Sequence, residues 1–328
     1  MNLRSVGILG TGSYVPERVL SNADLEKLVD TSDEWIFTRT GMRERRIAAP
    51  DQATSDLAIA AGRRAIEASG VDPKTITLII LATVTPDQPV PSAACFVQKA
   101  LGLTNAACID INAACPGFVT ALSLGTGMVE CGRAERALVI GAECMSRITD
   151  YEDRSSCILF GDGAGAVVLG ADAPRGRVLT SFLCADGNGV ETMYIRAGGS
   201  RKPASAATVD AREHKLRIKG NETYRFAVDK FRELVERQMR EHSLTPDDFG
   251  LVIPHQVNYR IIESALRRID IPEEKIFMNL EKYGNTSGAS VGIALDEAHR
   301  AGRLVEGKYV SLLAFGAGLT WASVLLRW

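Results

Sequence analysis

The sequence predicts an α/β protein built from two similar halves that share one layered core. The helix, proline-containing turn and buried strand expected over residues 60–81 recur over residues 228–253. A Phe-Gly pair with a glycine turn and a strand also recurs, first at residues 160–169 and again at 315–326. Whole helix-and-strand units that repeat in this way indicate a duplicated α/β unit.

Length and composition agree with two halves. The chain has 328 residues, more than a single hydrophobic core usually holds. The polar segment 171–177 contains Pro and Gly, so we expect an N-terminal half over 1–174 and a C-terminal half over 175–328. Hydrophobic residues make up 46% and charged residues 24%, which is typical of a globular protein. The net charge of −2 argues against wholesale nucleic-acid binding.

The individual elements follow from local signals. A capping box at residues 31–34 starts a short helix, and a longer helix that begins near Thr54 ends at Gly70. Short, continuously apolar runs predict strands that are buried on both faces. Such buried strands are expected at 76–82, 166–169 and 251–254, other strands at 6–9, 108–111 and 137–141, and further helices at 92–101, 116–129 and 289–300. The segment 187–217 has no strong period and is expected to be a long loop.

Cys115 lies between a short strand and a helix, in a stretch with no charged residue from 111 to 129. Pro116 suits a helix start, and the positive end of the helix dipole would favour a thiolate. We expect this helix to be buried all round. Its length allows a membrane span, but its Asn, Pro, Ser, Thr and Gly residues favour a core helix. The alternative for Cys115 is a small, inert, buried residue.

The cysteine pattern indicates the compartment. Seven cysteines form no C-x-x-C pair and have no neighbouring His, so neither a disulfide framework nor a metal site is supported. The first four residues lead directly into a strand, with no signal peptide. We therefore expect a protein of the reducing cytoplasm, with no membrane or nucleic acid among its partners.

Two further residues complete a chemical set. His255 follows the buried strand that ends at Pro254, and Asn285 lies in a turn that opens a helix. Taken alone, His255 could be a core histidine and Asn285 a helix cap. With Cys115 they suit covalent acyl transfer, in which two neutral donors stabilise an oxyanion or enolate. A Cys-His-Asn hydrolase is the competing interpretation. It needs water, whereas the charge-poor, glycine-lined surroundings favour a dry site.

The motifs around these residues resemble those of the β-ketoacyl-[acyl carrier protein] synthase III family. They are Ala-Ala-Cys115-Pro-Gly-Phe, Pro-His255-Gln-Val-Asn, Gly-Asn285-Thr-Ser, Thr31-Ser-Asp-Glu-Trp35 with Thr38-Arg-Thr-Gly41, Phe160-Gly-Asp-Gly-Ala-Gly165 and Phe315-Gly-Ala-Gly-Leu-Thr-Trp321. They span nearly the whole chain in the family's order.

The resemblance implies a thiolase-like fold with a layered αβαβα core, and a homodimer. It implies that Cys115 accepts an acyl group from acyl-CoA, with no cofactor. His255 and Asn285 would then bind the thioester of malonyl-acyl carrier protein while CO2 leaves. The oxyanion hole would consist of the backbone N–H groups of Cys115 and Ala317.

The resemblance also implies three sets of binding residues. Coenzyme A would contact Thr31, Trp35, Arg39, Arg154 and Asn258. The acyl pocket would include Val90 and Phe315. An acidic carrier protein would dock at Arg225, Arg260 and Lys219, although a solvated helix face explains these three equally well.

The chain departs from the family pattern near the site. Val90 stands where acetyl-selective members often carry a Phe that reaches across the dimer, so we expect a primer larger than acetyl. Pro116, Val257 and Gly288 each replace a commoner Ala. The alternative is a secondary-metabolism relative that condenses or transfers an acyl group to another acceptor. A hydroxymethylglutaryl-CoA synthase would need a general acid, and no convincing Glu flanks Cys115. A cysteine hydrolase and a non-catalytic binding protein are the alternatives outside this class.

Overall fold

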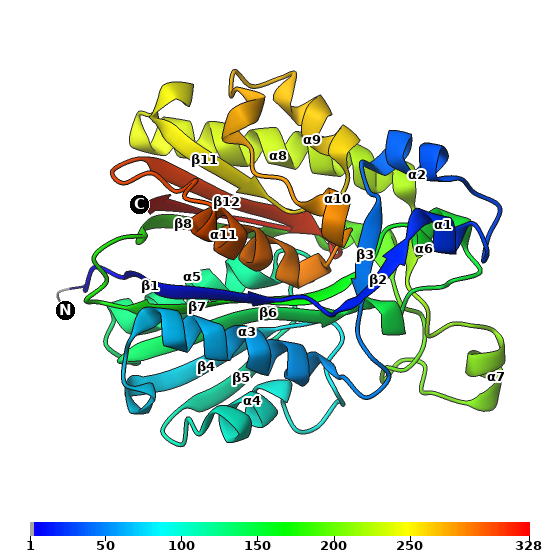
Figure 1. Cartoon of the computed structure of the whole chain (residues 1–328), viewed down its shortest axis with the longest axis horizontal. Helices are drawn as coiled ribbons and strands as arrows, with labels where there is room; N and C mark the ends of the chain where they lie inside the picture. Colours follow the sequence, from blue (N-terminus) through cyan, green and yellow to red (C-terminus); the bar gives the residue numbers. More distant parts are fainter. Residues whose placement is uncertain (1–2) are drawn as a thin grey trace.

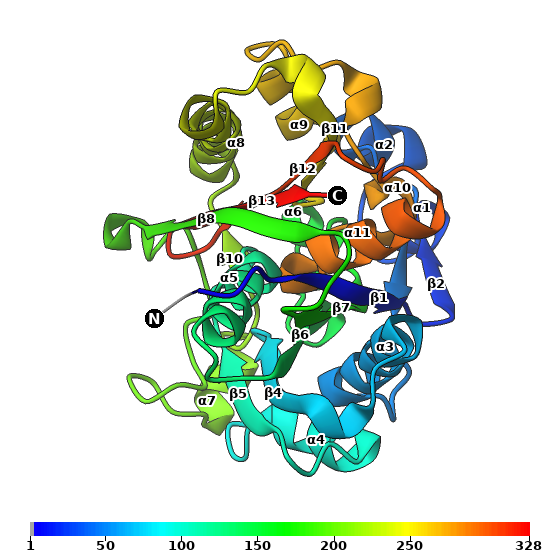
Figure 2. The same ribbon diagram turned by 90° about the vertical axis from the view of Figure 1, so that its left-hand side faces the viewer.

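The computed structural model describes residues 3–328 and contains two sheets stacked with helices in five layers (Figures 1 and 2). The first sheet has the order β1 (Gly7–Tyr14), β7 (Asp162–Gly170), β6 (Arg136–Cys144), β4 (Ile76–Ala82) and β5 (Ala107–Ile111). The second has the order β11 (Phe249–Pro254), β12 (Tyr309–Gly316), β13 (Thr320–Arg327) and β8 (Arg177–Ala185). The two sheets therefore draw their strands from separate halves of the chain.

The strand directions repeat between the sheets, as duplication requires. In the first sheet β4 and β6 are parallel, whereas β6 with β7 and β7 with β1 are antiparallel. In the second sheet β11 and β12 are parallel, whereas β12 with β13 and β13 with β8 are antiparallel. The first sheet adds β5, parallel to β4, as an edge strand. The expected α/β architecture of two related halves in a layered αβαβα core is confirmed.

Two helices form the central layer between the sheets: α5 (Gly117–Glu130) and α11 (Ser290–Arg300) (Figure 2). The outer layers are α3 (Thr54–Ser69) with α4 (Ala93–Leu101) on the first sheet, and α8 (Gly220–His242) with α9 (Tyr259–Leu266) on the second. Apolar side chains on both faces of each sheet account for the continuously apolar strands. The N-terminal ends of α5 and α11 thus lie in the middle of the molecule.

The remaining elements are short and lie around one end of the sheets. They are α1 (Asn22–Leu25), α2 (Asp33–Thr40), α6 (Arg154–Cys157), α7 (Ala206–Asp210), α10 (Leu280–Tyr283), and the ribbons β2 (Arg18–Ser21) with β3 (Glu44–Ile47) and β9 (Met193–Tyr194) with β10 (Arg217–Ile218). The expected long loop at 187–217 is therefore partly structured. Asp150, which is 3% exposed, binds Arg212 and Arg217 and so anchors this segment.

Helix α5 differs from the expectation in one respect. Leu124 is 43% and Met128 36% exposed, so the helix is not buried all round in a single chain. Its other face packs between the sheets, and that packing explains why it carries no charged residue before Glu130. Among residues 3–328, no helix is both long and apolar enough to cross a membrane.

Candidate active site

Cys115 lies in the tight connection between β5 and α5 and is 5% exposed. Ala114, directly before it, has a φ of 51°, a left-handed conformation that costs energy for a residue with a side chain. The Ala114 carbonyl accepts a hydrogen bond from the N–H of Gly117 at 2.8 Å. This strained turn places the thiol at the N-terminal end of α5, in the central layer.

Burial dominates the chemistry of this thiol. It raises the pKa of Cys115 to about 12, and the nearby Glu143 carboxylate acts in the same direction. The hydroxyl of Ser287, 3.8 Å from Sγ, opposes the shift. The sequence-based expectation of a favoured thiolate was therefore wrong for the resting protein, because burial opposes the charged form of the thiol. The thiol must lose its proton when the sulfur attacks.

His255 follows β11 directly and is fully buried. Burial lowers the pKa of His255 to about 3, so its ring is neutral at physiological pH. Its Nδ1 atom lies 2.7 Å from the hydroxyl of Ser290, and Nε2 has no hydrogen-bond partner among residues 3–328. When the hydroxyl donates to Nδ1, the ring proton resides on Nε2 and is available to a substrate. The ring of Phe315 packs edge-on against it, with 6.0 Å between centroids.

Because this imidazole is already neutral well below physiological pH, we expect decarboxylation of a malonyl thioester to show no histidine inflection between pH 5 and pH 8. The folded pKa lies below the ordinary value, so the charged ring appears only in more acidic solution. Measuring CO2 release across this range checks the prediction. A rise in the rate of CO2 release with an apparent pKa near 6 that persists in Glu143→Gln would contradict a neutral donor.

Asn285 is held by the Phe160-Gly161 motif of the other half. Its N–H donates to the Leu159 carbonyl at 2.8 Å, and its carbonyl accepts from the N–H of Gly161 at 3.1 Å. The side-chain Oδ1 atom accepts from the N–H of Ser287 at 2.8 Å. This bond orients the amide and leaves the Nδ2 group as the donor that can face a substrate.

The turn at residues 285–290 brings the three functional residues together. Within this short segment, Asn285 supplies an amide, Ser287 touches the Cys115 sulfur and Ser290 binds the His255 ring. Gly316, at the end of β12, closes the other side. A Cβ atom there would lie 2.9 Å from the Cys115 Cβ atom, so a side chain has no room.

The sequence did not identify several residues that support this site. Ser287, Ser290 and Gly316 are ordinary residues in sequence, and each contacts a partner at least 35 residues away. No convincing Glu flanks Cys115 in the sequence, but the fold brings one close to it from another strand. Glu143 is fully buried on β6 close to the thiol. Only the tertiary structure reveals these contacts.

The predicted oxyanion and acyl-pocket residues occupy different surroundings. Ala317 follows Gly316, so its N–H belongs to the turn that abuts Cys115. Phe315 is 3% exposed beside His255. Val90 is 80% exposed, and the single chain gives this side chain almost no packing. The roles of all three residues stay predictions.

Most of the predicted coenzyme A residues lie near one another. Two guanidinium groups lie over the Trp35 ring, with Arg39 4.3 Å and Arg154 4.8 Å from its centroid. The side chain of Asn258 caps α9 by accepting from the N–H of Arg260 at 2.9 Å. Arg260 Nε in turn donates to the Thr38 carbonyl of α2. The Thr31 hydroxyl is buried without a hydrogen-bond partner in the described part of the chain.

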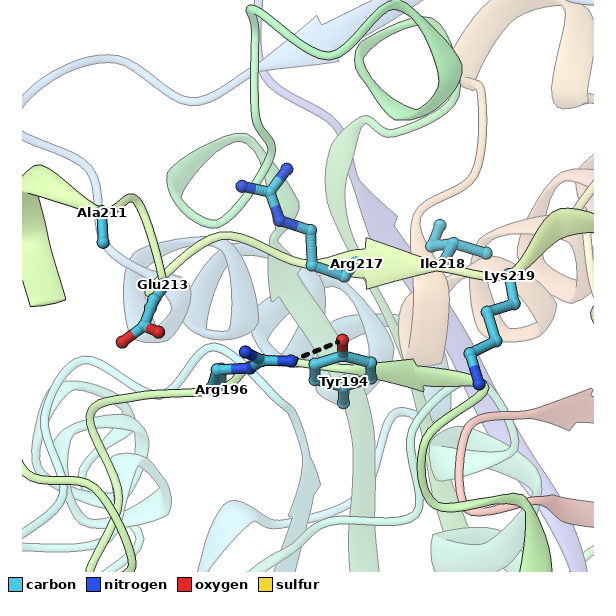
Figure 3. Close-up of a pocket in the computed structure, with 7 residues that line it drawn as sticks. All are labelled: Tyr194, Arg196, Ala211, Glu213, Arg217, Ile218 and Lys219. Carbon is cyan, nitrogen blue, oxygen red and sulfur yellow. Dashed lines mark hydrogen bonds between the residues drawn. The ribbon is translucent and has the colours of Figure 1, made fainter.

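The three predicted docking residues fall into two groups. Arg225 and Arg260 are exposed on α8 and α9, which the Tyr224 hydroxyl joins by donating to the Arg260 carbonyl at 3.2 Å. Lys219 instead lines a surface pocket of about 400 Å³ beside the β9–β10 ribbon (Figure 3). Tyr194, Arg196 and Arg217 lie around the same pocket.

The geometry distinguishes acyl transfer from hydrolysis. In a Cys-His-Asn hydrolase the His binds the Cys, and the Asn orients the His. Here Ser290 binds His255 and the N–H of Ser287 binds Asn285, so among residues 3–328 these partners differ from those of such a hydrolase. Within residues 3–328, no group of three or more His, Cys, Asp or Glu is placed to hold a metal ion. The fold and the site together define a thiolase-like condensing enzyme, an acyltransferase.

Comparisons with known proteins specify the family. Residues 109–187 match the model for 3-oxoacyl-[acyl-carrier-protein] synthase III, and residues 239–328 match the model for its C-terminal part. A beta-ketoacyl-[acyl-carrier-protein] synthase III from Caldanaerobacter subterraneus subsp. tengcongensis is 51% identical over 99% of this chain and 98% of its own length. The same-named protein of Symbiobacterium thermophilum is 48% identical over 100% of this chain and 99% of its own.

Structure comparison agrees. The crystal structure of 3-oxoacyl-[acyl-carrier-protein] synthase III from Aquifex aeolicus VF5 superposes with a TM-score of 0.90 at 42% identity, covering 98% of this chain and 100% of that chain. The chain therefore belongs to the β-ketoacyl-[acyl carrier protein] synthase III family.

Proposed function

We propose that this enzyme starts fatty-acid synthesis by joining an acyl-CoA primer to malonyl-acyl carrier protein with loss of CO2. The observation that carries the proposal is the turn at 285–290, which sets the Asn285 amide, the Cys115 thiol and the neutral His255 ring around one point. The names of the curated relatives favour this role over a secondary-metabolism acceptor.

In the first half-reaction, the Cys115 sulfur attacks the acyl-CoA carbonyl and loses its proton. The carbonyl oxygen becomes an oxyanion that the N–H groups of Cys115 and Ala317 stabilise. The C–S bond to coenzyme A then breaks, and the departing thiolate takes up a proton. The raised pKa of Cys115, about 12, means that this attack needs proton removal as the new bond forms.

In the second half-reaction, malonyl thioester oxygen accepts hydrogen bonds from His255 Nε2 and Asn285 Nδ2. The bond to the carboxylate breaks, and its electron pair becomes an enolate that these two donors stabilise. The enolate carbon attacks the acyl-Cys carbonyl, and the Cys115 sulfur leaves and regains a proton. Both donors are neutral, so they stabilise the charge that develops without first pairing with the malonyl carboxylate. The scheme balances without a cofactor.

Intact-protein mass spectrometry with a panel of acyl-CoA primers, followed by malonyl-carrier protein, tests this function. We expect one acyl adduct on Cys115 that is converted to a β-ketoacyl product and CO2. Release of free acid without use of malonyl thioester would indicate a hydrolase, and transfer to another acceptor would indicate the secondary-metabolism alternative.

Coenzyme A binding at Trp35 is supported by the two guanidinium groups that lie over its ring. Stacking of a base on an aromatic ring contributes about 1–3 kcal/mol. We therefore expect Trp35→Ala to raise the KM for acyl-CoA by roughly 10-fold and to leave kcat nearly unchanged. Steady-state kinetics with acyl-pantetheine, which lacks the nucleotide, provides the control. An equal rise in KM for that truncated substrate would exclude adenine stacking.

We propose that the enzyme is a homodimer. Strand β5 is a free edge of the first sheet, and its Ile109 is 43% exposed. The following helix α5 exposes Leu124 and Met128. An unpaired strand edge with apolar neighbours is a template for pairing with a second chain. Such a dimer would give the exposed Val90 a place in the partner's acyl pocket.

If Val90 limits that pocket, a larger side chain should restrict it. We expect Val90→Phe to lower the ratio of butyryl to acetyl transfer onto Cys115 by at least about 10-fold, because a pocket discriminates one methylene by about 1–3 kcal/mol. Single-turnover acylation with each primer measures the ratio. Val305→Phe is a matched control, since Val305 is 51% exposed elsewhere on the surface. An unchanged ratio in Val90→Phe would remove Val90 from the pocket.

Surface charge supports the proposed docking of the carrier protein, and the state of the cysteines supports a cytoplasmic location. Arg225 and Arg260 offer adjacent positive charges to an acidic carrier protein, and Lys219 would add a third. All seven cysteines, which lie within the described residues, are free, as in a reducing cytoplasm. Thr31 and Asn258 complete the proposed coenzyme A contacts.

A further inference from the structure

Glu143 is a buried acid that the proposed chemistry does not use. It is 0% exposed on β6, and it forms no ion pair with residues of the described chain. Its carboxylate instead accepts bonds from the hydroxyls of Thr83 at 3.1 Å and Thr85 at 2.7 Å. The N–H of Val84 lies 3.0 and 3.2 Å from its two oxygens. Burying a carboxylate that is bound only by neutral donors reduces the free energy of unfolding. The retention of such a group beside the active site therefore suggests that it has a function there.

The Glu143 carboxylate also lies close to the turn at residues 285–290. Gly288 belongs to this turn, and its backbone lies close to the carboxylate. A Cβ atom on Gly288 would lie 3.1 Å from Glu143 Oε1 and 3.2 Å from the Ala114 carbonyl oxygen, so Gly288 is held between this acid and the residue before Cys115. Glu143 therefore lies close to the Cys115 thiol, between the residues that follow β4 and the turn that carries Asn285.

The Thr83–Thr85 segment that binds Glu143 leads into the loop that carries Val90. Residues 83–85 continue into the loop 86–92, whose Asp87 accepts from the N–H of Ser55 at 2.9 Å. One carboxylate thus joins the backbone that leads to Val90 with the turn that positions Asn285.

We propose that Glu143 is a positioning residue for condensation, whose carboxylate fixes residues 83–85 and the Asn285 turn in one arrangement around Cys115. This inference rests on the proposed function. Three donors surround the carboxylate: the Thr83 and Thr85 hydroxyls and the Val84 N–H. The ionised form accepts from all three, whereas the protonated acid would turn an O–H group toward them. A glutamine in its place would turn an N–H group toward donors and leave some of them without a partner.

Because the proposed arrangement requires an ionised Glu143, the rate of condensation should depend on pH. Burial raises the pKa of Glu143 to about 7, while its Thr and backbone donors act in the opposite direction. The titratable groups that face it are Cys115 and Cys144, and burial raises the pKa of each thiol to about 12. Neither thiol changes charge near neutrality. Condensation by the natural protein should therefore rise as pH increases through about 7.

The test compares Glu143→Gln, Glu143→Asp and a control in the full-length enzyme. The control is Asp296→Asn, because Asp296 is 1% exposed and binds Thr11, Ser13 and Arg300, away from Cys115. Three quantities are measured: kcat for condensation from pH 5.5 to 9, the KM for acyl-CoA, and the pH midpoint of Cys115 alkylation by iodoacetamide.

For Glu143→Gln we expect kcat to fall by about 10- to 100-fold with little change in KM, because buried donors lose their acceptor. The inflection near pH 7 should disappear. The alkylation midpoint should move to lower pH, because the charge that opposes the thiolate is gone. Glu143→Asp should keep the natural alkylation midpoint, since it keeps the charge, but should condense slowly because its side chain is shorter.

An unchanged pH profile and alkylation midpoint in Glu143→Gln would overturn the proposal, and so would an equal loss in Asp296→Asn. If Glu143→Gln fails to fold, the profile of the natural enzyme decides, and the absence of an inflection near pH 7 then counts against it. A natural enzyme that is acylated but never condenses would refute the proposed function instead.

Discussion

Replacing Cys115 by Ser is expected to abolish the acyl-enzyme and to lower condensation by at least about 1,000-fold. The sulfur is the only atom that the proposed scheme uses to hold the primer. A serine hydroxyl at this place is a much weaker nucleophile, and the structure gives it no base, because Ser290 and not Cys115 binds His255. Acylation measured by intact mass, with peptide mapping of any adduct, checks the result.

Cys157→Ser provides the matched control. Cys157 is also fully buried, and burial raises the pKa of this thiol to about 11, but it lies in a small apolar cluster near α6. We expect this variant to form the adduct at nearly the natural rate. An adduct that persists on Cys115→Ser, or that maps to another cysteine, would show that the nucleophile lies elsewhere.

The second large effect is expected at the two donors. His255→Ala and Asn285→Ala should each lower kcat for condensation by about 100- to 1,000-fold, the usual loss when one oxyanion donor is removed. Each substitution deletes a hydrogen bond to the enolate that forms after CO2 leaves. Acylation of Cys115 should change by only a few-fold, because the backbone donors that serve that step remain. Single-turnover acylation and CO2 release, measured separately, distinguish the two half-reactions.

His242→Ala, near the end of α8, controls for loss of a histidine outside the site. The double variant His255→Ala with Asn285→Ala should be little worse than either single variant, because the two donors act on one oxygen. Loss of acylation equal to the loss of condensation would contradict the division of roles. It would indicate that His255 activates the thiol, as in a hydrolase.

Much of the candidate site could be predicted because its residues follow strong local patterns. Cys115 lies in the short connection between a strand and an uncharged helix, His255 directly follows an apolar strand, and Asn285 stands in a glycine turn before a helix. Strand and helix ends of duplicated units meet at the same place in an α/β core. The repeated strand directions in the two sheets confirm the duplication on which this argument depended.

The rest could not be predicted because it depends on which atoms meet when segments distant in sequence pack together. Ser290 is one hydroxyl among many until the fold places it 2.7 Å from the His255 ring. The ionisation of Cys115 was predicted wrongly, since the sequence shows a helix start but not how completely the thiol is removed from water. The exposure of one face of α5 could not be predicted either. A helix without charged residues indicates that its surface is buried, but not whether the same chain or a second chain covers it.

By itself, therefore, the sequence determined the α/β class, the duplication and the chemical set of thiol, imidazole and amide. These depend on apolar periodicity, turn residues and side-chain chemistry, which are local properties. The tertiary structure decided the direction in which the pKa of Cys115 shifts, the hydrogen-bond partner of His255 Nδ1, and the contacts of Glu143 with Thr83, Thr85 and the turn at residues 285–290. Solvation and hydrogen-bond partners set these properties, and both exist only once distant segments pack together.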